Sequence, residues 1–132
     1  MSPKPRTSKR KRVKKGSRLP HAEAAGIDLP KLRDYVLDPD HWDNDGKAVA
    51  FARKLGIHRK DWRYLHDQIL EKLPGSDVTR INLSSPERVE FTVSILIRGR
   101  NDETREVVTG WGVDALKEPW LITAYVGRKH RS

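Results

Sequence analysis

One nine-residue stretch constrains the fold of this chain more than any other feature, because apolar residues occupy every second position in it. The residues concerned are Val89, Phe91, Val93, Ile95 and Ile97. A period of two is that of a β-strand with one buried face. The turn sequence Gly99-Arg-Asn-Asp102 follows. A second alternating stretch, 107–113, comes after it, so we predict a β-hairpin.

Two further segments complete the predicted sheet. Residues 120–126 (Trp-Leu-Ile-Thr-Ala-Tyr-Val) are typical of a strand, and 77–83 form a weaker one. Connections of hairpin length favour antiparallel pairing. We therefore predict four strands in one antiparallel sheet.

Before residue 75 the apolar spacing changes to that of helices. Pro30 suits a first helical position and Asp28 a cap, and Asp38-Pro39 ends this helix. A second helix follows a cap at Asn44 or Asp45 and ends at Gly56, and a third runs from near Asp61 to Pro74-Gly75. The residues expected to face the core are Leu29, Leu32, Val36, Ala48, Phe51, Ala52, Leu55, Trp62, Leu65, Ile69 and Leu73. The fold class is thus α+β, with two to three N-terminal helices packed on one face of the sheet.

Positive charge is concentrated at the N-terminus. Residues 1–18 contain nine Lys and Arg and no acid, whereas the other 114 residues contain 18 basic and 18 acidic side chains. We interpret 1–18 as a disordered basic tail, 19–28 as a linker, 29–127 as a single domain and 128–132 as a short basic end. The tail residues expected to bind a polyanion are Lys9, Arg10, Lys11, Arg12, Lys14 and Lys15.

The composition excludes several classes of protein. The chain has no cysteine, so it has no disulfide, thiolate metal site or thiol nucleophile. No apolar run approaches the ~20 residues of a membrane span, and Leu19-Pro20-His21 follows the basic segment where a signal peptide would be apolar. We expect a cytoplasmic protein without membrane contact. Dinucleotide-binding, P-loop and HExxH motifs are absent.

Two residues between the first two helices are candidates for catalysis. A loop histidine such as His41 can act as a general acid or base, because histidine changes charge between pH 5 and 8. Lys47, in the first turn of the second helix, opposes the helix dipole but suits a site that binds phosphate there. The alternatives are an ordinary surface histidine and a solvated lysine.

The same loop superficially imitates a calcium site. His41-x-Asp43-x-Asp45-Gly46 resembles the start of an EF-hand loop, but its first position is His and its twelfth is Ala52. We therefore predict no metal site and no cofactor. The simpler interpretation is that the acidic side chains of this loop cap helices or face solvent.

Hydroxyl and aromatic side chains share faces of the predicted strands. Thr109 lies with Trp111, and Thr123 lies with Tyr125. Such side chains can orient a phosphate or stack a base. They are also favoured in strands for packing alone.

Several short motifs resemble a bacterial domain family of unknown function whose members resemble the tips of polymorphic secreted toxins. The motifs are Lys31-Leu-Arg-Asp-Tyr-Val-Leu-Asp-Pro-Asp-His41, Gly46-Lys-Ala48, Phe51, Leu55-Gly56, Trp62, Leu65, Thr109-x-Trp111 and Leu121-Ile-Thr-Ala-Tyr125. That family is similar to the barnase–EndoU–colicin–RelE group of metal-independent ribonucleases. The resemblance covers about residues 29–127. It implies His41 and Lys47 as active-site residues, with Thr109, Thr123 and Tyr125 on the substrate face.

We therefore expect a toxin-like endoribonuclease in which the 2′-hydroxyl of RNA attacks and leaves a 2′,3′-cyclic phosphate. His41, Lys47, Thr123 and Tyr125 are its expected catalytic residues, and Thr109 and Trp111 its expected substrate contacts. RNA, from the ribosome or tRNA, is the expected partner, together with an immunity protein or antitoxin. The alternative is a non-enzymatic RNA- or ribosome-binding protein anchored by its tail. A third interpretation takes Lys9–Lys15 as a nuclear-localisation signal.

Overall fold

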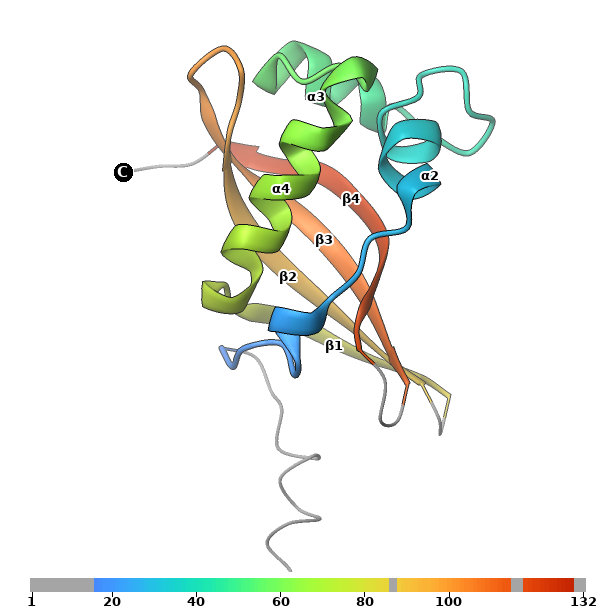
Figure 1. Cartoon of the computed structure of the whole chain (residues 1–132), viewed down its shortest axis with the longest axis vertical. Helices are drawn as coiled ribbons and strands as arrows, with labels where there is room; N and C mark the ends of the chain where they lie inside the picture. The colour runs from blue at the N-terminus through green and yellow to red at the C-terminus, as the bar shows by residue number, and fades with distance from the viewer. Residues whose placement is uncertain (1–15, 86–87, 115–117, 130–132) are drawn as a thin grey trace, which may run out of the picture.

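Helices cover one side of a four-stranded sheet in the structure, a computed structural model that describes residues 16–85, 88–114 and 118–129 (Figure 1). The strands are β1 (Val78–Ser85), β2 (Arg88–Arg98), β3 (Thr104–Asp114) and β4 (Trp120–Lys129). They pair in the order β1-β2-β3-β4, and each pair is antiparallel. The expected α+β fold, with its helices before its strands, is confirmed.

The helical elements precede the sheet in the chain. The first helix begins as α2 (Leu29–Lys31) and continues through a wider turn, η2 (Leu32–Val36). The longer helices are α3 (Lys47–Leu55) and α4 (Trp62–Lys72), and the single-turn segments are η1 (Ala22–Ala24), η3 (Arg59–Asp61) and η4 (Leu73–Gly75). In Figure 1, α4 crosses the sheet diagonally and α2 lies on the side of β4.

The alternation in β2 places one row of side chains under the helices. Phe91, Val93, Ile95 and Ile97 are all buried, and they belong to the same apolar core as Leu65 of α4. Each side chain of this size contributes about 1.5–3 kcal/mol when it is fully buried. The period of two therefore fixes which sheet face the helices cover.

The segment predicted as a linker is instead part of the fold. Leu19 and Ala22 are buried in the core, and Gly26 pairs with β4 through hydrogen bonds to Pro119 and Leu121. Enough apolar side chains lie between residues 19 and 27 to give this segment a packed position. The boundary predicted for the tail is also too late, because Gly16 and Ser17 form backbone hydrogen bonds with Val78 and Arg18 forms an ion pair with Asp77.

The β2–β3 turn lies against the end of α3. The N–H of Arg100 donates to the carbonyl of Leu55 at 2.8 Å. Gly99 permits this approach, because a Cβ there would overlap Leu55. The C-terminal end of α3 therefore lies beside the turn and the start of α4.

Among the helices of the described residues, none is both long and apolar enough to span a membrane.

Candidate active site at the edge of strand β4

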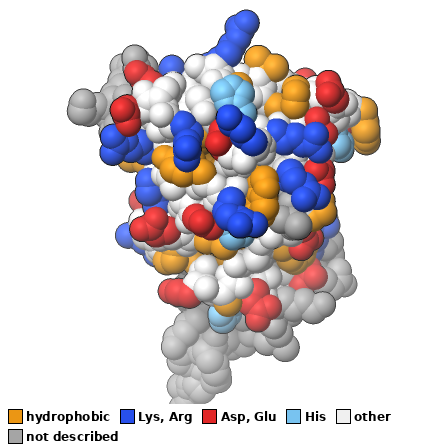
Figure 2. All heavy atoms as spheres, turned by 45° about the horizontal axis from the view of Figure 1, so that its top comes forward, with side chains coloured by type: hydrophobic (Ala, Val, Ile, Leu, Met, Phe, Trp, Pro, Cys, Tyr) orange, Lys and Arg blue, Asp and Glu red, His pale blue; other side chains and the backbone are white. Residues whose placement is uncertain are grey.

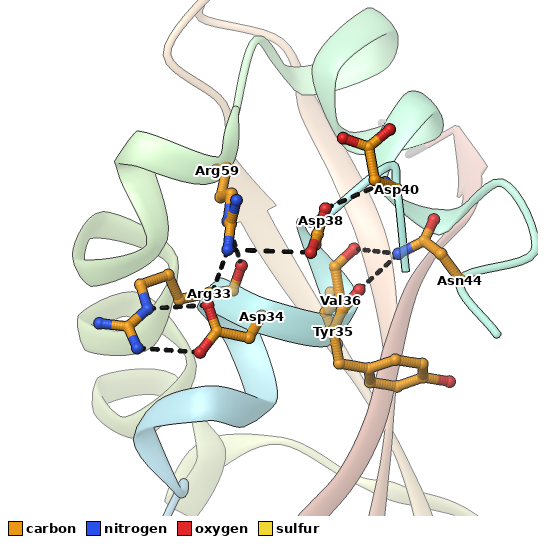
Figure 3. Close-up of polar contacts among 8 residues, drawn as sticks. All are labelled: Arg33, Asp34, Tyr35, Val36, Asp38, Asp40, Asn44 and Arg59. Atoms are coloured by element: carbon orange, nitrogen blue, oxygen red, sulfur yellow. Dashed lines mark hydrogen bonds and ion pairs between the residues drawn. The ribbon is translucent and has the colours of Figure 1, made fainter. Parts of the chain in front are cut away.

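A buried asparagine holds the loop that carries His41. Asn44 is 3% exposed, and its side-chain amide donates to the carbonyls of Tyr35 and Val36 at the end of η2 (Figure 3). Its side-chain oxygen accepts from the N–H of Ala48 at 2.8 Å. The N-cap position of α3 is Gly46 rather than the predicted Asn44 or Asp45, but the Asn44 side chain still bonds the first turn of α3 and ties the two helices together.

The geometry of His41 favours one tautomer of the neutral ring. Its Nδ1 accepts a hydrogen bond from the backbone N–H of Asp43 at 3.0 Å. In the neutral ring the proton then resides on Nε2. The exposed ring of Trp42 stacks on His41 at 5.8 Å between centroids. His41 thus presents an Nε2–H donor.

Tyr35 of η2 lies at the centre of the site. The His41 ring meets the Tyr35 ring edge to face at 5.0 Å between centroids. The Nζ atoms of Lys31 and Lys47 each lie 5.4 Å from the centre of the same ring. Lys47 also donates from Nζ to the carbonyl of Asn44 at 3.3 Å. One aromatic ring therefore gathers a histidine and two ammonium groups.

Two open grooves flank Tyr35 along β4. The first, of about 790 Å³, is lined by Asp28, Pro30, Lys31, Asp34, Tyr35, His41, Asp43, Ile122 and Thr123. The second, of about 540 Å³, is lined by Tyr35, Asp45, Gly46, Lys47, Ala50, Thr123, Tyr125 and Val126. Tyr35 and Thr123 belong to both grooves. The four residues expected to be catalytic thus line a continuous surface on this edge of the sheet.

Thr123 has an unsatisfied hydroxyl in this surface. Its Oγ1 is buried and has no hydrogen-bond partner among the described residues. A buried polar group without a partner costs free energy unless a ligand or water satisfies it. Tyr125, two residues on, is 44% exposed, so its side chain is accessible from the second groove.

An ion-pair network fixes the helix behind Tyr35. Asp34 accepts from Arg33 and from Arg59 of η3, and Arg59 also donates to the carbonyl of Arg33. Hydrogen bonds from Arg33 first, and then from Arg59, hold the pKa of the Asp34 carboxyl well below its usual range. Figure 3 shows the Tyr35 ring pointing away from these arginines. The network therefore orients η2, and through Asp34 it also borders the first groove.

The prediction that Thr109 and Trp111 contact the substrate is wrong, because both side chains are buried. Both side chains are 0% exposed in β3, on the face that the helices cover. Thr109 donates to the carbonyl of Val93 at 2.7 Å and accepts from the indole N–H of Trp111 at 2.8 Å. These two residues satisfy each other inside the core, so neither can contact RNA in this structure.

The other expected binding residues lie in the tail. Lys9, Arg10, Lys11, Arg12, Lys14 and Lys15 fall outside the described residues. Arg128 and Lys129 close the described part of β4.

Charge around the grooves is mixed. The loop before α3 carries Asp38, Asp40, Asp43 and Asp45, while Lys31 and Lys47 flank Tyr35. Figure 2 shows basic and acidic side chains interspersed over one face of the molecule. Within residues 16–85, 88–114 and 118–129, no group of three His, Cys, Asp or Glu is placed to hold a metal ion. The first groove can therefore offer an anion the ammonium group of Lys31 and the Nε2–H of His41, and the second groove the ammonium group of Lys47.

Sequence reasoning assigned no role to Lys31 or Tyr35. The spacing carried a usable signal, because residues four apart are neighbours on a helix surface. Leu32 and Val36 mark the buried side of this helix, so Lys31 and Tyr35 had to lie together on a neighbouring side. The hydroxyl of Thr123 had no such signal, since only the packed structure shows that it lacks a partner.

Comparison with known proteins identifies a family and nothing further. The chain belongs to the family described as a domain of unknown function (DUF6883), whose profile matches residues 18–128. This range includes the segment 19–28 that packs into the core. No curated protein and no solved structure matches the chain.

Proposed function

We propose that this DUF6883 member is a metal-independent endoribonuclease that uses the 2′-hydroxyl of RNA as its nucleophile. The observation that carries this proposal is the gathering of His41, Lys47, Thr123 and Tyr125 around Tyr35 at one edge of the sheet. The resemblance to toxin-type ribonucleases supports it. Attack of the 2′-oxygen on the adjacent phosphorus expels the 5′-oxygen of the next nucleotide and leaves a 2′,3′-cyclic phosphate.

The two lysines supply the charge that this reaction requires. Negative charge develops on the phosphoryl oxygens as the new P–O bond forms. Lys31 and Lys47 each lie 5.4 Å from the centre of the Tyr35 ring, Lys31 in the first groove and Lys47 in the second, so an anion in either groove meets an ammonium group. Donors fixed in advance stabilise such charge without reorganising, and removing one such donor costs roughly 10²–10³-fold in rate.

His41 is placed to donate a hydrogen bond from Nε2 rather than to accept one. The Asp43 N–H occupies the Nδ1 lone pair, and the ring proton of the neutral histidine lies on Nε2. We assign Nε2–H as a hydrogen-bond donor to a phosphoryl oxygen, while the 2′-hydroxyl proton passes to water and the leaving 5′-oxygen takes a proton from water. The Thr123 hydroxyl is buried and lacks a partner among the described residues, and rotation of this groove-lining side chain would let it donate to the same phosphate, which Tyr125 can position.

The test compares RNA cleavage by the wild-type protein and by His41→Ala, in the presence of EDTA. We expect the wild type to produce ends with a 2′,3′-cyclic phosphate and the variant to lose at least ~10²-fold in rate. His21→Ala, at an exposed histidine remote from the grooves in the sequence, is the matched control. Equal cleavage by the wild type and His41→Ala, or none by either, would contradict the proposal.

A non-enzymatic RNA- or ribosome-binding protein is the second candidate. The charge distribution favours it, because four carboxylates lie in the loop before α3 and the N-terminal 18 residues carry nine Lys and Arg. Here the tail would supply the affinity and the folded part would be a neutral platform. RNA binding that is abolished by removing the tail, without cleavage at any salt concentration, would support this candidate. An immunity protein or antitoxin is a partner only under the first proposal.

A further inference from the structure

One short segment of the folded part carries an excess of positive charge. Residues 53–63 contain Arg53, Lys54, Arg59, Lys60 and Arg63 but only one acid, Asp61. Asp61 is directed inward: its side chain is 13% exposed and accepts from the backbone N–H of His58 at 2.9 Å. Asp61 also lies 4.0 Å from Arg100, so it is occupied by His58 and Arg100 and forms no ion pair with the exposed cations of this segment.

Most other exposed arginines are already paired with acids. Arg33 and Arg59 bind Asp34, Arg98 binds Asp102, and Arg18 binds Asp77. By contrast, Arg53, Lys54, Lys60 and Arg63 form no ion pair with the described residues, although all four are exposed. We name these four side chains the basic end. Their charge is available to a partner.

The basic end is one continuous region because three elements meet there. The turn at Arg100 binds the carbonyl of Leu55, and Asn101 donates to the carbonyl of Lys54 at 3.3 Å. Arg100 in turn packs on Tyr64 of α4, 4.9 Å from the ring centre. Arg63 lies 4.9 Å from the ring centre of Trp62, so an aromatic ring lies among the cations.

We propose that the basic end binds the phosphates of the RNA substrate a few nucleotides from the scissile bond. This inference rests on the proposed function, and it names a substrate contact outside the grooves. The helix α3 links the two places, since Lys47 begins it and Arg53 and Lys54 lie in its last turn. Its nine residues span about 13 Å at ~1.5 Å per residue. That length corresponds to roughly four stacked nucleotides at ~3.4 Å each.

RNA fits the basic end better than a membrane surface does. The described residues of the basic end are cationic and polar, and the nearby aromatic side chain Trp62 is half-buried and covered by Arg63. An interfacial membrane anchor requires exposed apolar side chains beside its cations. Exposed cations without exposed apolar neighbours suit the phosphate backbone of single-stranded RNA.

The test measures binding of single-stranded RNA by full-length protein in the His41→Ala background, so that no substrate is cut. Lys54→Gln/Lys60→Gln is compared with Arg80→Gln/Arg98→Gln, which removes the same charge at exposed positions of β1 and β2. We expect the first pair of substitutions to weaken binding and to flatten the slope of log K against log salt by about 1.4, at ~0.7 per phosphate contact. The control pair should leave that slope unchanged.

The alternative results of this binding test each support or overturn a proposal. Equal slopes for the two double variants would overturn the proposal, because binding would then follow net charge alone. If Lys54→Gln/Lys60→Gln loses binding to phosphatidylserine vesicles but binds RNA as the parent protein does, the RNA proposal is overturned in favour of a membrane surface. If Lys54→Gln/Lys60→Gln weakens RNA binding but the wild type never cleaves RNA, the basic end stands and the proposed nuclease activity fails. If the wild type cleaves RNA and Lys54→Gln/Lys60→Gln binds it normally, the proposed nuclease activity stands and the proposal for the basic end fails.

Discussion

At the scale of single residues, the chemistry of the site depends on which nitrogen of His41 carries the proton. If Nε2–H acts only as a hydrogen-bond donor, the side-chain N–H of a glutamine can partly replace the hydrogen bond that His41 donates. His41→Gln should then retain rates within about tenfold of wild type, whereas His41→Ala loses about 10²-fold or more. Cleavage rates of the three proteins measured from pH 5 to 8 check this. Equal losses for Gln and Ala would instead indicate that His41 transfers a proton.

Tyr35 is a positioning residue, because it acts through the groups that its ring contacts. Its ring lies 5.4 Å from each of two ammonium groups, and each such contact contributes about 0.5–1 kcal/mol. Tyr35→Phe keeps the ring and should retain activity, whereas Tyr35→Leu should lose about tenfold in kcat/KM. The measurement is the rate of RNA cleavage at several salt concentrations. Loss of activity in both variants would point to the hydroxyl rather than the ring.

At the scale of elements, Asn44 connects η2 to α3 and so sets the position of the whole loop. Replacing it with alanine leaves the N–H of Ala48 in the first turn of α3 without its acceptor and the carbonyls of Tyr35 and Val36 without their donor. We expect Asn44→Ala to lower the free energy of unfolding by about 2–4 kcal/mol. Denaturant unfolding measures this. Asn82→Ala, at an exposed position of β1, is the control and should change stability by less than ~0.5 kcal/mol.

The ion pair between η2 and η3 makes stability depend on acid. Arg33 and Arg59 lower the pKa of Asp34 in the folded state. Its contribution is therefore complete above the unfolded value of about 3.9 and is lost as the pH falls toward the folded pKa. The wild type should exceed Asp34→Asn in stability at pH 6, and the difference should shrink by pH 2. A difference that is constant with pH would contradict this assignment.

The elements themselves were largely predictable from the sequence, whereas the site was only partly so. Apolar periods placed β2 and α4 because their burial follows directly from spacing. Thr109 and Trp111 were misassigned because alternation alone does not say which polar residues satisfy each other in a core. The apolar residues of 19–28 follow neither a helical nor a strand spacing, so the sequence predicts only a linker there. Contacts with β4 and the core show that the segment is packed into the fold.

At the scale of the whole molecule, the point at which the tail joins the described fold and the grooves lie at opposite edges of the sheet. Gly16–Arg18 lie beside the start of β1, while the grooves follow β4, three strands away. At ~4.8 Å between strands, the two edges are about 15 Å apart. An RNA that bridges them must therefore be longer than the few atoms around the scissile phosphate.

This separation predicts that the effect of the tail depends on the length of the substrate. Deleting residues 1–15 removes eight Lys and Arg and should raise KM and flatten its salt dependence for long RNA. Cleavage of a dinucleotide should be unchanged, because that substrate reaches only the grooves. Steady-state kinetics on both substrates measures the difference. An equal loss on the dinucleotide would mean that the tail contributes to the site itself, and that His41 and the two lysines do not suffice for catalysis.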